Sequence, residues 1–389
     1  MPSAASVVER EAEHLAQVYA QLPLEIVSAS GVFLHTGDGR RILDLYGGHA
    51  VASLGYAHPR VVETLRRQAE TLTFQSNAVA LDVRARAAGR LLALAPDELE
   101  RVFFVNSGAE ANENALRLAF HSFAERDHVV AVEQGFHGRT AAAGAVTWGA
   151  AGKWYGFPRA PFRVTFVPRD DVAALSRAIG ERTAAVIVEP IQGIAGAVPL
   201  APAFLEATRT LTRERGAILI FDEVQCGVGR AGTGFASSLY DVVPDLITTA
   251  KALGAGFPVG AVLMTRDIAS SLGVGDLGTT FGGGPLACAL IEAVLETIEE
   301  ERLLVNVRRL SDLVRQTCVV GPVEGIQGAG FLLGLRCPSG AARVRDELLR
   351  RDILTGTSSD PNVLRLLPPF VLEEEHVGQL AAALQEIGG

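Results

Sequence analysis

The feature that most constrains the fold of this chain is a series of short apolar segments that alternate with helical patterns. Each segment is a nearly continuous run of Val, Ile, Leu, Ala or Phe, which is typical of parallel strands covered on both faces. The alternation predicts an α/β domain with a mainly parallel sheet covered by helices. The expected strands are RVFFVN (101–106), HVVAVEQ (128–134), VTFVP (164–168), AAVIVEP (184–190), AILIFDEV (217–224) and VGAVLMT (259–265).

The pattern of the chain changes near Pro285. A long helical pattern there leads into shorter strands such as GFLLGLR and NVLRLLP, which favours a smaller α+β domain. The length of 389 residues also exceeds what one simple core usually holds. We therefore predict an N-terminal segment over 1–50 that is partly associated with the small domain, a large domain over 51–285 and a small domain over 286–389.

Composition excludes several classes of partner. The net charge of −9 argues against nucleic acids and anionic membranes as main partners. No apolar run approaches the roughly 18 residues of a membrane span, and the N-terminus lacks the basic and apolar regions of a signal peptide. The four cysteines form neither a Cys-x-x-Cys motif nor a Cys/His cluster, so we expect no metal site and no disulfide framework. These features favour a cytoplasmic protein.

Lysine is rare in this chain, because only Lys153 and Lys251 occur among 35 basic residues. A surviving lysine in such a chain is a candidate for chemistry that Arg cannot perform, since Lys can lose its proton and attack a carbonyl group. Lys251 lies in the nearly uncharged stretch LITTAKALGAGFPVGAVL, where desolvation lowers the pKa of an ammonium group from about 10.4. We interpret Lys251 as a Schiff-base lysine and Lys153 as an ordinary surface residue.

Two segments are suited to a phosphate group. In FFVNSGAEANENALRLAF, Ser107 and Glu110 predict a capping box, and Gly108 allows a ligand to approach the helix N-terminus closely. GTTFGGGP (278–285) is a loop of Thr and Gly that can surround phosphate oxygens. A well-capped helix and a flexible surface loop explain these two segments equally well when each is taken alone.

A pair of acidic residues, Asp222 and Glu223, ends the strand AILIF. Ligands of open α/β sheets bind at such carboxyl ends. The segment resembles the Walker B strand of ATPases, but neither lysine fits the GxxxxGK[ST] motif that an ATPase also needs. The glycines at 227, 229 and 232 match GxGxxG, yet no helix of the required length follows them, which argues against a dinucleotide fold.

The loop GFHGRT (135–140) adds Phe136, His137 and Arg139, although His137 alone is more often a structural histidine. Together the motifs meet the needs of pyridoxal 5'-phosphate (PLP). A desolvated lysine forms an imine, a strand-end carboxylate pairs with the ring nitrogen, and an aromatic side chain stacks. A helix N-terminus and a Thr/Gly loop hold the phosphate. PLP is therefore the predicted cofactor.

With these motifs in view, the chain resembles the class III (ω-amino) aminotransferases, specifically the acetylornithine/ornithine aminotransferase branch. The resemblance runs from GVFLHTGDGRRILDLYGGHAVASLGYAHP (31–59) to NVLRLLPPF (362–370). It implies the PLP fold-type I and a homodimer with the active site at the subunit interface. The motifs that carry it are NSGAEAN, FHGRT, EPIQG, FDEVQ, AKALGAGFPVGA and GTTFGGGPLACA.

The resemblance implies a role for most motif residues. Lys251 would carry PLP and Asp222 would pair with the pyridine nitrogen, as the two catalytic residues. Gln225 would approach the ring hydroxyl, Phe136 would stack on the ring, and Thr280 would reach the phosphate from the partner subunit. The cofactor-binding residues implied by the resemblance are Ser107, Gly108, Ala109, Phe136, Asp222, Glu223, Val224, Gln225, Lys251 and Thr280.

The resemblance also implies substrate-binding residues. Arg139 would bind the α-carboxylate of the ω-amine donor together with Tyr19, and Thr279 would belong to the same site. Arg365 would bind the α-carboxylate of glutamate and 2-oxoglutarate. One position departs from the family, which usually reads E-P-x-Q-G-E-G-G, because this chain reads EPIQGIAG with Ile194 at the second Glu. In the family that Glu masks the glutamate-binding Arg while the donor reacts.

The function that the resemblance implies is transfer of the δ-amino group of an N-acylornithine, with N-acetylornithine first, to 2-oxoglutarate in arginine biosynthesis. Ornithine, 4-aminobutyrate and acyl-lysine compounds are alternative donors. An aminomutase is an alternative that needs no external keto acid. A non-catalytic PLP-fold protein is a further alternative, but such a protein has no need of Lys251 or Asp222.

Overall fold

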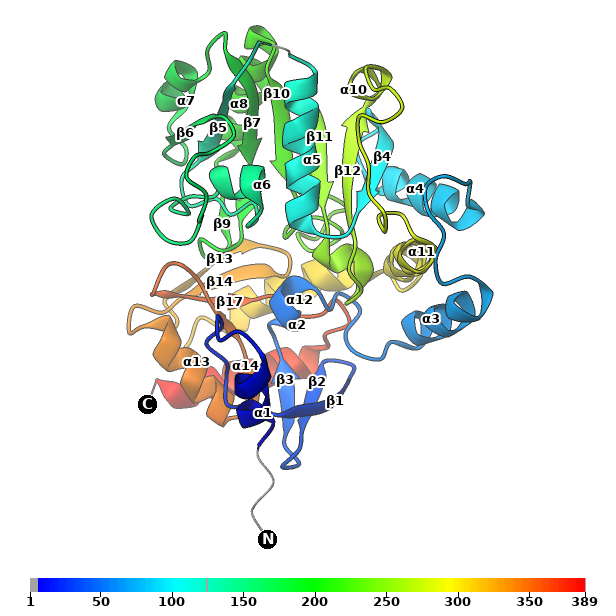
Figure 1. Ribbon diagram of the computed structural model, residues 1–389. Coiled ribbons are helices and arrows are strands. Elements are labelled where there is room, and N and C mark those ends of the chain that lie inside the picture. Colours follow the sequence, from blue (N-terminus) through cyan, green and yellow to red (C-terminus); the bar gives the residue numbers. More distant parts are fainter. Residues whose placement is uncertain (1–5, 124, 389) are drawn as a thin grey trace.

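The computed structural model describes residues 6–123 and 125–388, and a seven-stranded sheet forms its upper part in Figure 1. The strand order is β4-β12-β11-β10-β7-β5-β6. Only β12 runs antiparallel to its two neighbours, so the predicted mainly parallel sheet is confirmed. The strands are β4 (Leu99–Val105), β12 (Gly260–Thr265), β11 (Leu246–Thr249), β10 (Ile218–Asp222), β7 (Thr183–Val188), β5 (His128–Val132) and β6 (Arg163–Val167).

Helices cover both faces of this sheet, because alternate residues of each strand face opposite sides. In β5, Val129 and Ala131 pack in the cluster that contains α5 (Gly108–His121), whereas Val130 and Val132 pack in the cluster of the other face. Helix α5 crosses the front of the sheet in Figure 1. The remaining helices of this part are α3 (Pro59–Thr71), α4 (Asp82–Leu94), α6 (Ala141–Ala145), α7 (Val172–Ala178), α8 (Pro202–Arg215), α9 (Ser237–Tyr240), α10 (Arg266–Ser270) and α11 (Pro285–Glu300), with a 3-10 helix η1 (Lys251–Gly254).

The lower part of the molecule contains two four-stranded sheets. One is β1 (Ile26–Ser30), β2 (Phe33–Thr36), β3 (Arg41–Asp44) and β15 (Ile353–Leu354), and the other is β13 (Gly325–Ala329), β14 (Leu332–Arg336), β17 (Val363–Leu366) and β16 (Gly356–Thr357). A short pair, β8 (Ile191–Gln192) and β9 (Val198–Pro199), follows β7. The helices here are α1 (Val7–His14), α2 (Gly47–Ala50), α12 (Leu303–Thr317), α13 (Ala341–Arg350) and α14 (Glu374–Ile387).

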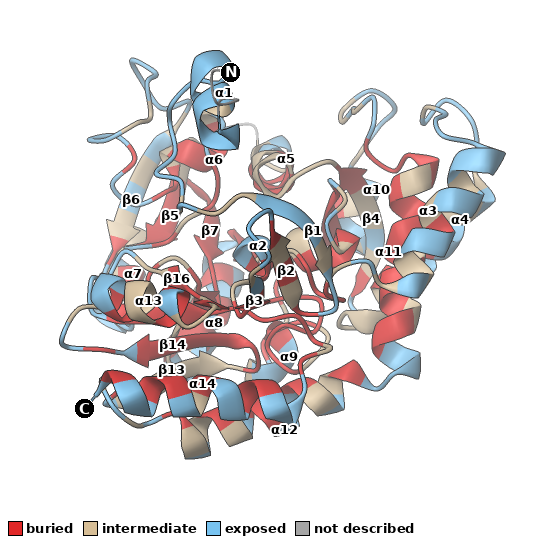
Figure 2. Ribbon diagram, turned by 90° about the horizontal axis from the view of Figure 1, so that it is seen from below, coloured by how far each residue is buried: buried red, intermediate tan, exposed pale blue. Residues whose placement is uncertain are grey.

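The N-terminal and C-terminal segments share a sheet, because β15 pairs in parallel with β3 through Ile353 and Leu43. This pairing supports our proposal that residues 1–50 associate with the small domain. Helices α12 and α14 pack against each other, and Figure 2 shows one buried and one exposed side on each. Within the described residues, no helix combines the length and the apolar character needed to cross a membrane.

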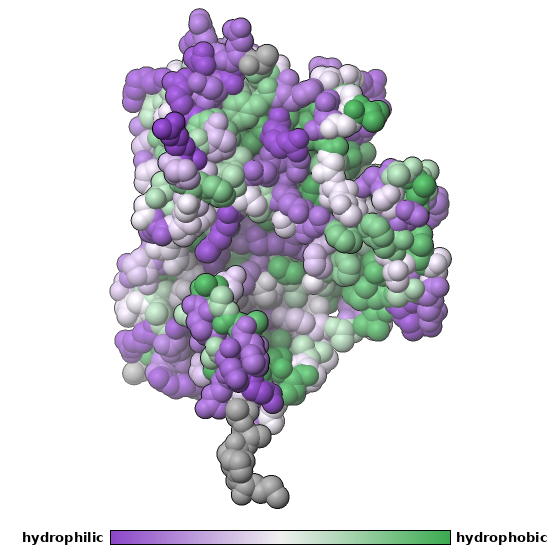
Figure 3. Space-filling model, in the orientation of Figure 1, coloured by the Kyte–Doolittle hydropathy of each residue, from purple (hydrophilic) through white to green (hydrophobic). Residues whose placement is uncertain are grey.

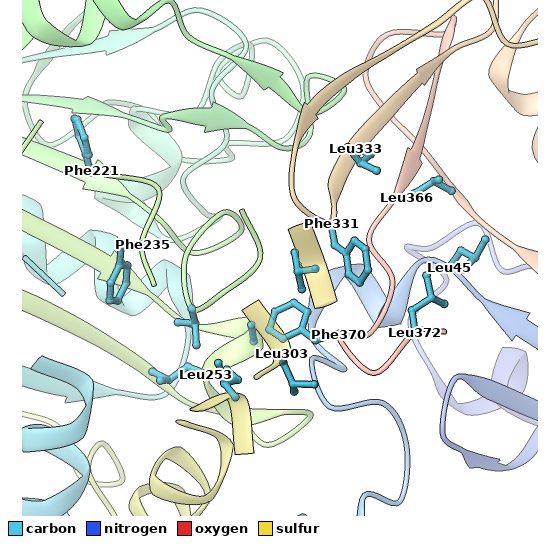
Figure 4. Close-up of a cluster of buried hydrophobic side chains, with 14 of the residues drawn as sticks. Leu45, Phe221, Phe235, Leu253, Leu303, Phe331, Leu333, Leu366, Phe370 and Leu372 are labelled. Atoms are coloured by element: carbon cyan, nitrogen blue, oxygen red, sulfur yellow. The ribbon is translucent and has the colours of Figure 1, made fainter. Parts of the chain in front are cut away.

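One hydrophobic cluster joins the two parts. Figure 4 shows Phe221 and Phe235 on the side of the large sheet, and Phe331, Leu366 and Phe370 on the side of the small one. All five side chains are buried in the same cluster. The parts therefore do not have separate cores, and burial of this apolar surface stabilises their relative position.

A buried arginine, Arg230, lies at the same junction. Its guanidinium group is fully buried and donates to the carbonyl oxygens of Pro368, Phe331 and Ala50. The ring of Phe370 lies 4.6 Å from the guanidinium carbon. No carboxylate of the described residues lies within 4 Å, and burial lowers the pKa of Arg230 to about 9. Arg230 thus ties three segments of the lower part to the loop that follows β10.

We predict that Arg230→Met lowers the free energy of unfolding by about 2–5 kcal/mol, because it leaves buried carbonyl oxygens without donors. Arg309→Met on the exposed side of α12 is the matched control and should cost no more than about 0.5 kcal/mol. Denaturant unfolding of both variants measures the two values. An Arg230 variant as stable as the control would show that the carbonyl contacts are dispensable.

Candidate active site

A cavity of about 420 Å³ opens at the carboxyl ends of the parallel strands. Its lining comes from the segments that follow β4, β5, β7, β10 and β11, so residues far apart in the sequence meet there. Figure 3 shows a hollow in the middle of this face, below the position of α5. The predicted site residues that line the cavity are Ser107, Gly108, Ala109, Phe136, Arg139, Asp222, Val224, Gln225 and Lys251.

One end of the cavity is formed by the N-terminus of α5. Ser107 is the N-cap residue, and its hydroxyl accepts the amide hydrogen of Glu110 at 3.2 Å. The carboxylate of Glu110 accepts from the amide of Asn106 rather than from that of Ser107, so only half of the predicted capping box forms. The amides of Gly108 and Ala109 precede the first intrahelical donor and are available to an anion.

Gly108 is required by its surroundings. A Cβ atom at this position would lie 2.6 Å from Cγ1 of Val224, which also lines the cavity. The bare backbone therefore allows the helix N-terminus to pack against the segment after β10. A phosphate group at this end would meet the positive end of the α5 dipole.

Lys251 is the first residue of η1 and is separated from β11 only by Ala250. Its backbone has a φ of 43°, a left-handed conformation that costs energy for a residue with a side chain. Burial lowers the pKa of Lys251, while the carboxylates of Asp222 and Glu189 act in the opposite direction. Within the described residues, no carboxylate lies within 4 Å of its amine. Lys153, by contrast, is exposed outside the cavity.

Asp222 is held at the end of β10 by three donors. Its Oδ2 accepts from Nδ1 of His137 at 2.8 Å and from Nδ2 of Asn112 at 2.7 Å, and its Oδ1 accepts from the amide of Val224 at 3.0 Å. Asn112 is oriented in turn by Thr248, whose hydroxyl donates to Oδ1 of the amide at 2.6 Å. Asp222 is only 2% exposed, so these donors compensate the burial of its charge.

Neither Asn112 nor His137 was predicted as a site residue. His137 was interpreted as structural, and its contact with Asp222 shows that it belongs to the site. Asn112 carried one usable signal, because it is a polar residue on a helix face that otherwise buries Ala111, Ala115 and Leu118. A buried amide in such a position needs polar partners.

Glu189, which follows β7, is a second buried carboxyl group at the cavity. Its oxygens accept from the amides of Phe136 at 2.8 Å and Gly193 at 3.0 Å. Burial, followed by the charge of Asp222, raises the pKa of Glu189 to about 7. Glu189 thereby holds the backbone of two segments, at Phe136 and at Gly193. Phe136 is the aromatic residue expected to stack on a cofactor.

Glu223 does not reach the cavity. Its carboxylate accepts from the backbone amides of Ala236 and Ser237 in the segment at the start of α9, with a distance of 2.8 Å to the second. Burial raises its pKa to about 7. Because successive residues of a strand point to opposite sides, Asp222 and Glu223 cannot both face the cavity. The lining of the cavity therefore gives no support to Glu223 as a cofactor-binding residue.

Three further expected residues lie outside the cavity lining. Thr279 accepts from the amide of Gly282 at 3.1 Å and lies 3.4 Å from Nδ2 of Asn106, next to the phosphate end. Thr280 is exposed in the same loop. Tyr19 is 79% exposed in the segment between α1 and β1, so this chain alone does not bring it to the site.

The two arginines expected to bind substrate lie in different environments. Arg139 is exposed at the cavity, with its guanidinium carbon 4.8 Å from the centre of the Trp154 ring. Arg365 is only 5% exposed and lies next to the lining residue Gln225, with Nη1 3.4 Å from its Oε1. Ile194 is also at the cavity wall, as its place in the EPIQGIAG motif implied.

The residues at the cavity fit PLP. Lys251 supplies a desolvated amine, Asp222 supplies an oriented carboxylate, and Gly108 and Ala109 present free amides on a backbone that a Cβ atom would obstruct. Phe136 adds an aromatic ring to the lining. Amine, carboxylate, anion site and aromatic ring are the four contacts that this cofactor needs.

Known proteins resemble this chain over almost its whole length. A family model described as Aminotransferase class-III matches residues 15–387. The acetylornithine aminotransferase of Methanocaldococcus jannaschii is 37% identical, over 98% of this chain and 97% of its own length. The acetylornithine aminotransferase of Streptomyces coelicolor is 41% identical, over 98% and 95%.

Solved structures agree with these relatives. The crystal structure of the ornithine aminotransferase from Toxoplasma gondii superposes with a TM-score of 0.90 at 29% identity, covering 98% of this chain and 94% of its own. The family match, the sequence relatives and the fold therefore coincide. The chain belongs to the class III aminotransferases, and it is a PLP-dependent aminotransferase.

Proposed function

We propose that this enzyme transfers the δ-amino group of an N-acylornithine, N-acetylornithine first, to 2-oxoglutarate. The observation that carries the proposal is the contrast between Arg139, which is exposed at the cavity, and Arg365, which is buried next to the lining residue Gln225. An acylornithine donor has one free carboxylate, whereas 2-oxoglutarate has two. One accessible and one covered arginine suit such a pair of substrates. The acetylornithine aminotransferases among the relatives support the same donor.

The roles of the residues follow from their surroundings. Bound PLP would supply an electron sink, and Lys251 would be the residue that holds it through Nζ. The lowered pKa of Lys251 favours a neutral amine, which can then move the proton from the reacting carbon of the donor. Asp222, oriented by His137 and Asn112, would pair with the pyridine nitrogen of bound PLP and favour its protonated form.

We further propose that the enzyme is a cytoplasmic homodimer and that the second subunit supplies Thr280 to the phosphate. Large apolar side chains are exposed together near α3, α4 and the loop of Thr280, and Figure 3 shows this area as green surface on its right side. The rings of Phe74 and Phe281 contact each other there at a tilt, with their centres 5.2 Å apart. An exposed apolar area of this kind is typical of a subunit interface. Its residues include Val62, Leu72, Phe74, Val79 and Phe281.

A panel of amino donors with 2-oxoglutarate tests the proposed function. N-acetylornithine should give glutamate at least tenfold faster, in kcat/KM, than ornithine, 4-aminobutyrate or N-acetyllysine; such a ratio corresponds to about 1.4 kcal/mol of transition-state stabilisation. Glutamate release is the measurement. A preference for free ornithine or for an acyl-lysine would replace the proposed donor. Isomerisation of a donor without 2-oxoglutarate would indicate an aminomutase.

Borohydride reduction of the enzyme should fix PLP on Lys251 and not on Lys153. Peptide mapping by mass spectrometry measures the position of the adduct. Lys251→Arg keeps the positive charge but cannot form an imine, so its turnover should fall below detection. Lys153→Arg is the matched control and should retain wild-type turnover, since Lys153 is exposed outside the cavity. An adduct on Lys153 would contradict the assignment.

Arg139→Lys should raise the KM for N-acetylornithine by about tenfold or more, because the planar fork that binds a carboxylate through two hydrogen bonds is lost. Single-turnover spectroscopy of the donor half-reaction measures this change. An amine donor that lacks a carboxylate is the control. The substitution should reduce reactivity with that amine less than reactivity with N-acetylornithine. Equal loss for both amines would mean that Arg139 has a structural role at the Trp154 ring.

A further inference from the structure

Arg365 is a buried cation whose hydrogen-bond partners are all neutral. Its Nε donates to the carbonyl oxygen of Thr357 at 2.8 Å, and its Nη1 lies 3.3 Å from the carbonyl oxygen of Gly193 and 3.4 Å from Oε1 of Gln225. Its Nη2 donates to the hydroxyl of Tyr46 at 2.8 Å. In the part of the chain that the structure describes, no carboxylate lies within 4 Å of this guanidinium. A buried cation of this kind attracts a carboxylate.

Tyr46 is fitted into this position. A Cβ atom on Gly356 would lie 1.9 Å from Cε2 of Tyr46, so the phenol ring packs directly against the backbone of β16. Gly356 is the residue that pairs with Arg365 across β16 and β17. The aromatic ring therefore lies beside the arginine because a glycine leaves room for it.

His49 completes the arrangement on the other side of the phenol. Its Nδ1 lies 2.8 Å from the hydroxyl of Tyr46, and the two ring centres are 4.7 Å apart. Because Arg365 donates to the phenol oxygen, the phenolic hydrogen remains for His49. Partial desolvation and the positive charges of Arg365 and Lys251 lower the pKa of His49, which favours the neutral ring that can accept this hydrogen.

An unusual backbone brings these two side chains together. The four residues of α2, from Gly47 to Ala50, all have positive φ, with 64° at His49 and 70° at Ala50. Left-handed backbone is unfavourable at a non-glycine residue, so the surroundings must hold it. Asp44 does so at the start of the turn, where its Oδ1 accepts from the amides of Tyr46 at 2.8 Å and Gly47 at 2.9 Å.

We propose that Tyr46, backed by His49, masks Arg365, and that a carboxylate of a dicarboxylate substrate takes the place of the phenol at Nη2. This inference rests on the proposed function, in which Arg365 binds glutamate and 2-oxoglutarate. Among the four partners, Tyr46 makes the only short bond from a side chain, whereas the carbonyls of Thr357 and Gly193 belong to the backbone. Tyr46 is thus a positioning residue that determines specificity through Arg365.

A neutral mask has a defined chemical consequence. A carboxylate binds guanidinium more strongly than a hydroxyl does, because the bond is charge-assisted and can be bidentate. A dicarboxylate can therefore displace the phenol. A substrate with one carboxylate can bind to Arg139 and leave the mask closed. Ile194 at the cavity wall offers no charge that could take over this role.

Equilibrium binding of glutarate to the PLP-loaded enzyme tests the mask without turnover. Tyr46→Phe keeps the ring that packs on Gly356 and removes only the hydroxyl. It should lower the dissociation constant of glutarate by about 2- to 10-fold, which is the change expected from the net free energy of one hydrogen bond. Binding of pentanoate, which has a single carboxylate, should change less than 2-fold. Isothermal titration calorimetry at fixed pH measures both dissociation constants.

Two variants separate the mask from its alternatives. Tyr56→Phe removes the hydroxyl that donates to Asp44 and thereby loosens the same turn without touching Arg365, so it should not tighten glutarate binding. Equal tightening in Tyr56→Phe, or unchanged or weaker binding in Tyr46→Phe, would overturn the mask. Arg365→Gln should weaken glutarate binding at least tenfold. If it does not, Arg365 is no dicarboxylate ligand, and its part in the proposed function fails together with the mask.

Discussion

The hydrogen bonds to Asp222 are the interaction on which the rest of the site depends. Its donors come from α5, from the loop after β5 and from the backbone after β10, and these segments meet only because β10 lies in the middle of the sheet. A buried carboxylate without such donors would be costly. The packing of α5 on the sheet therefore also positions a donor to Asp222, the carboxylate that would pair with the pyridine nitrogen of PLP. Fold and chemistry share one set of contacts here.

The sequence was sufficient for the class of fold, because a strand buried on both faces must be apolar throughout. The six predicted runs coincide with six strands of the large sheet. The seventh strand, β11, was not predicted, since Leu246–Thr249 has only four residues and half of them are threonines. The order of strands, and the pairing of Ile353 with Leu43, depend on contacts between distant segments, and no local pattern reports such contacts.

The site was predictable where its chemistry is local and hidden where it depends on tertiary structure. Lys251 and the Ser107 segment lie in motifs of consecutive residues, and the structure brings them to one cavity. The period of two along a strand could have excluded Glu223 as a neighbour of Asp222 on the same side. Tyr46 and His49 gave no such signal. Their contact needs a left-handed backbone at His49, and only the preceding pair of glycines hints at a turn.

The fully buried Arg230 has a mechanical consequence. It connects the loop after β10 to carbonyl groups of Ala50, Phe331 and Pro368, which belong to three different segments. Because the three carbonyl groups share one guanidinium, none of these segments can shift away from the loop without losing a buried hydrogen bond. Ala50 ends the turn that carries Tyr46, so this coupling reaches the surroundings of Arg365.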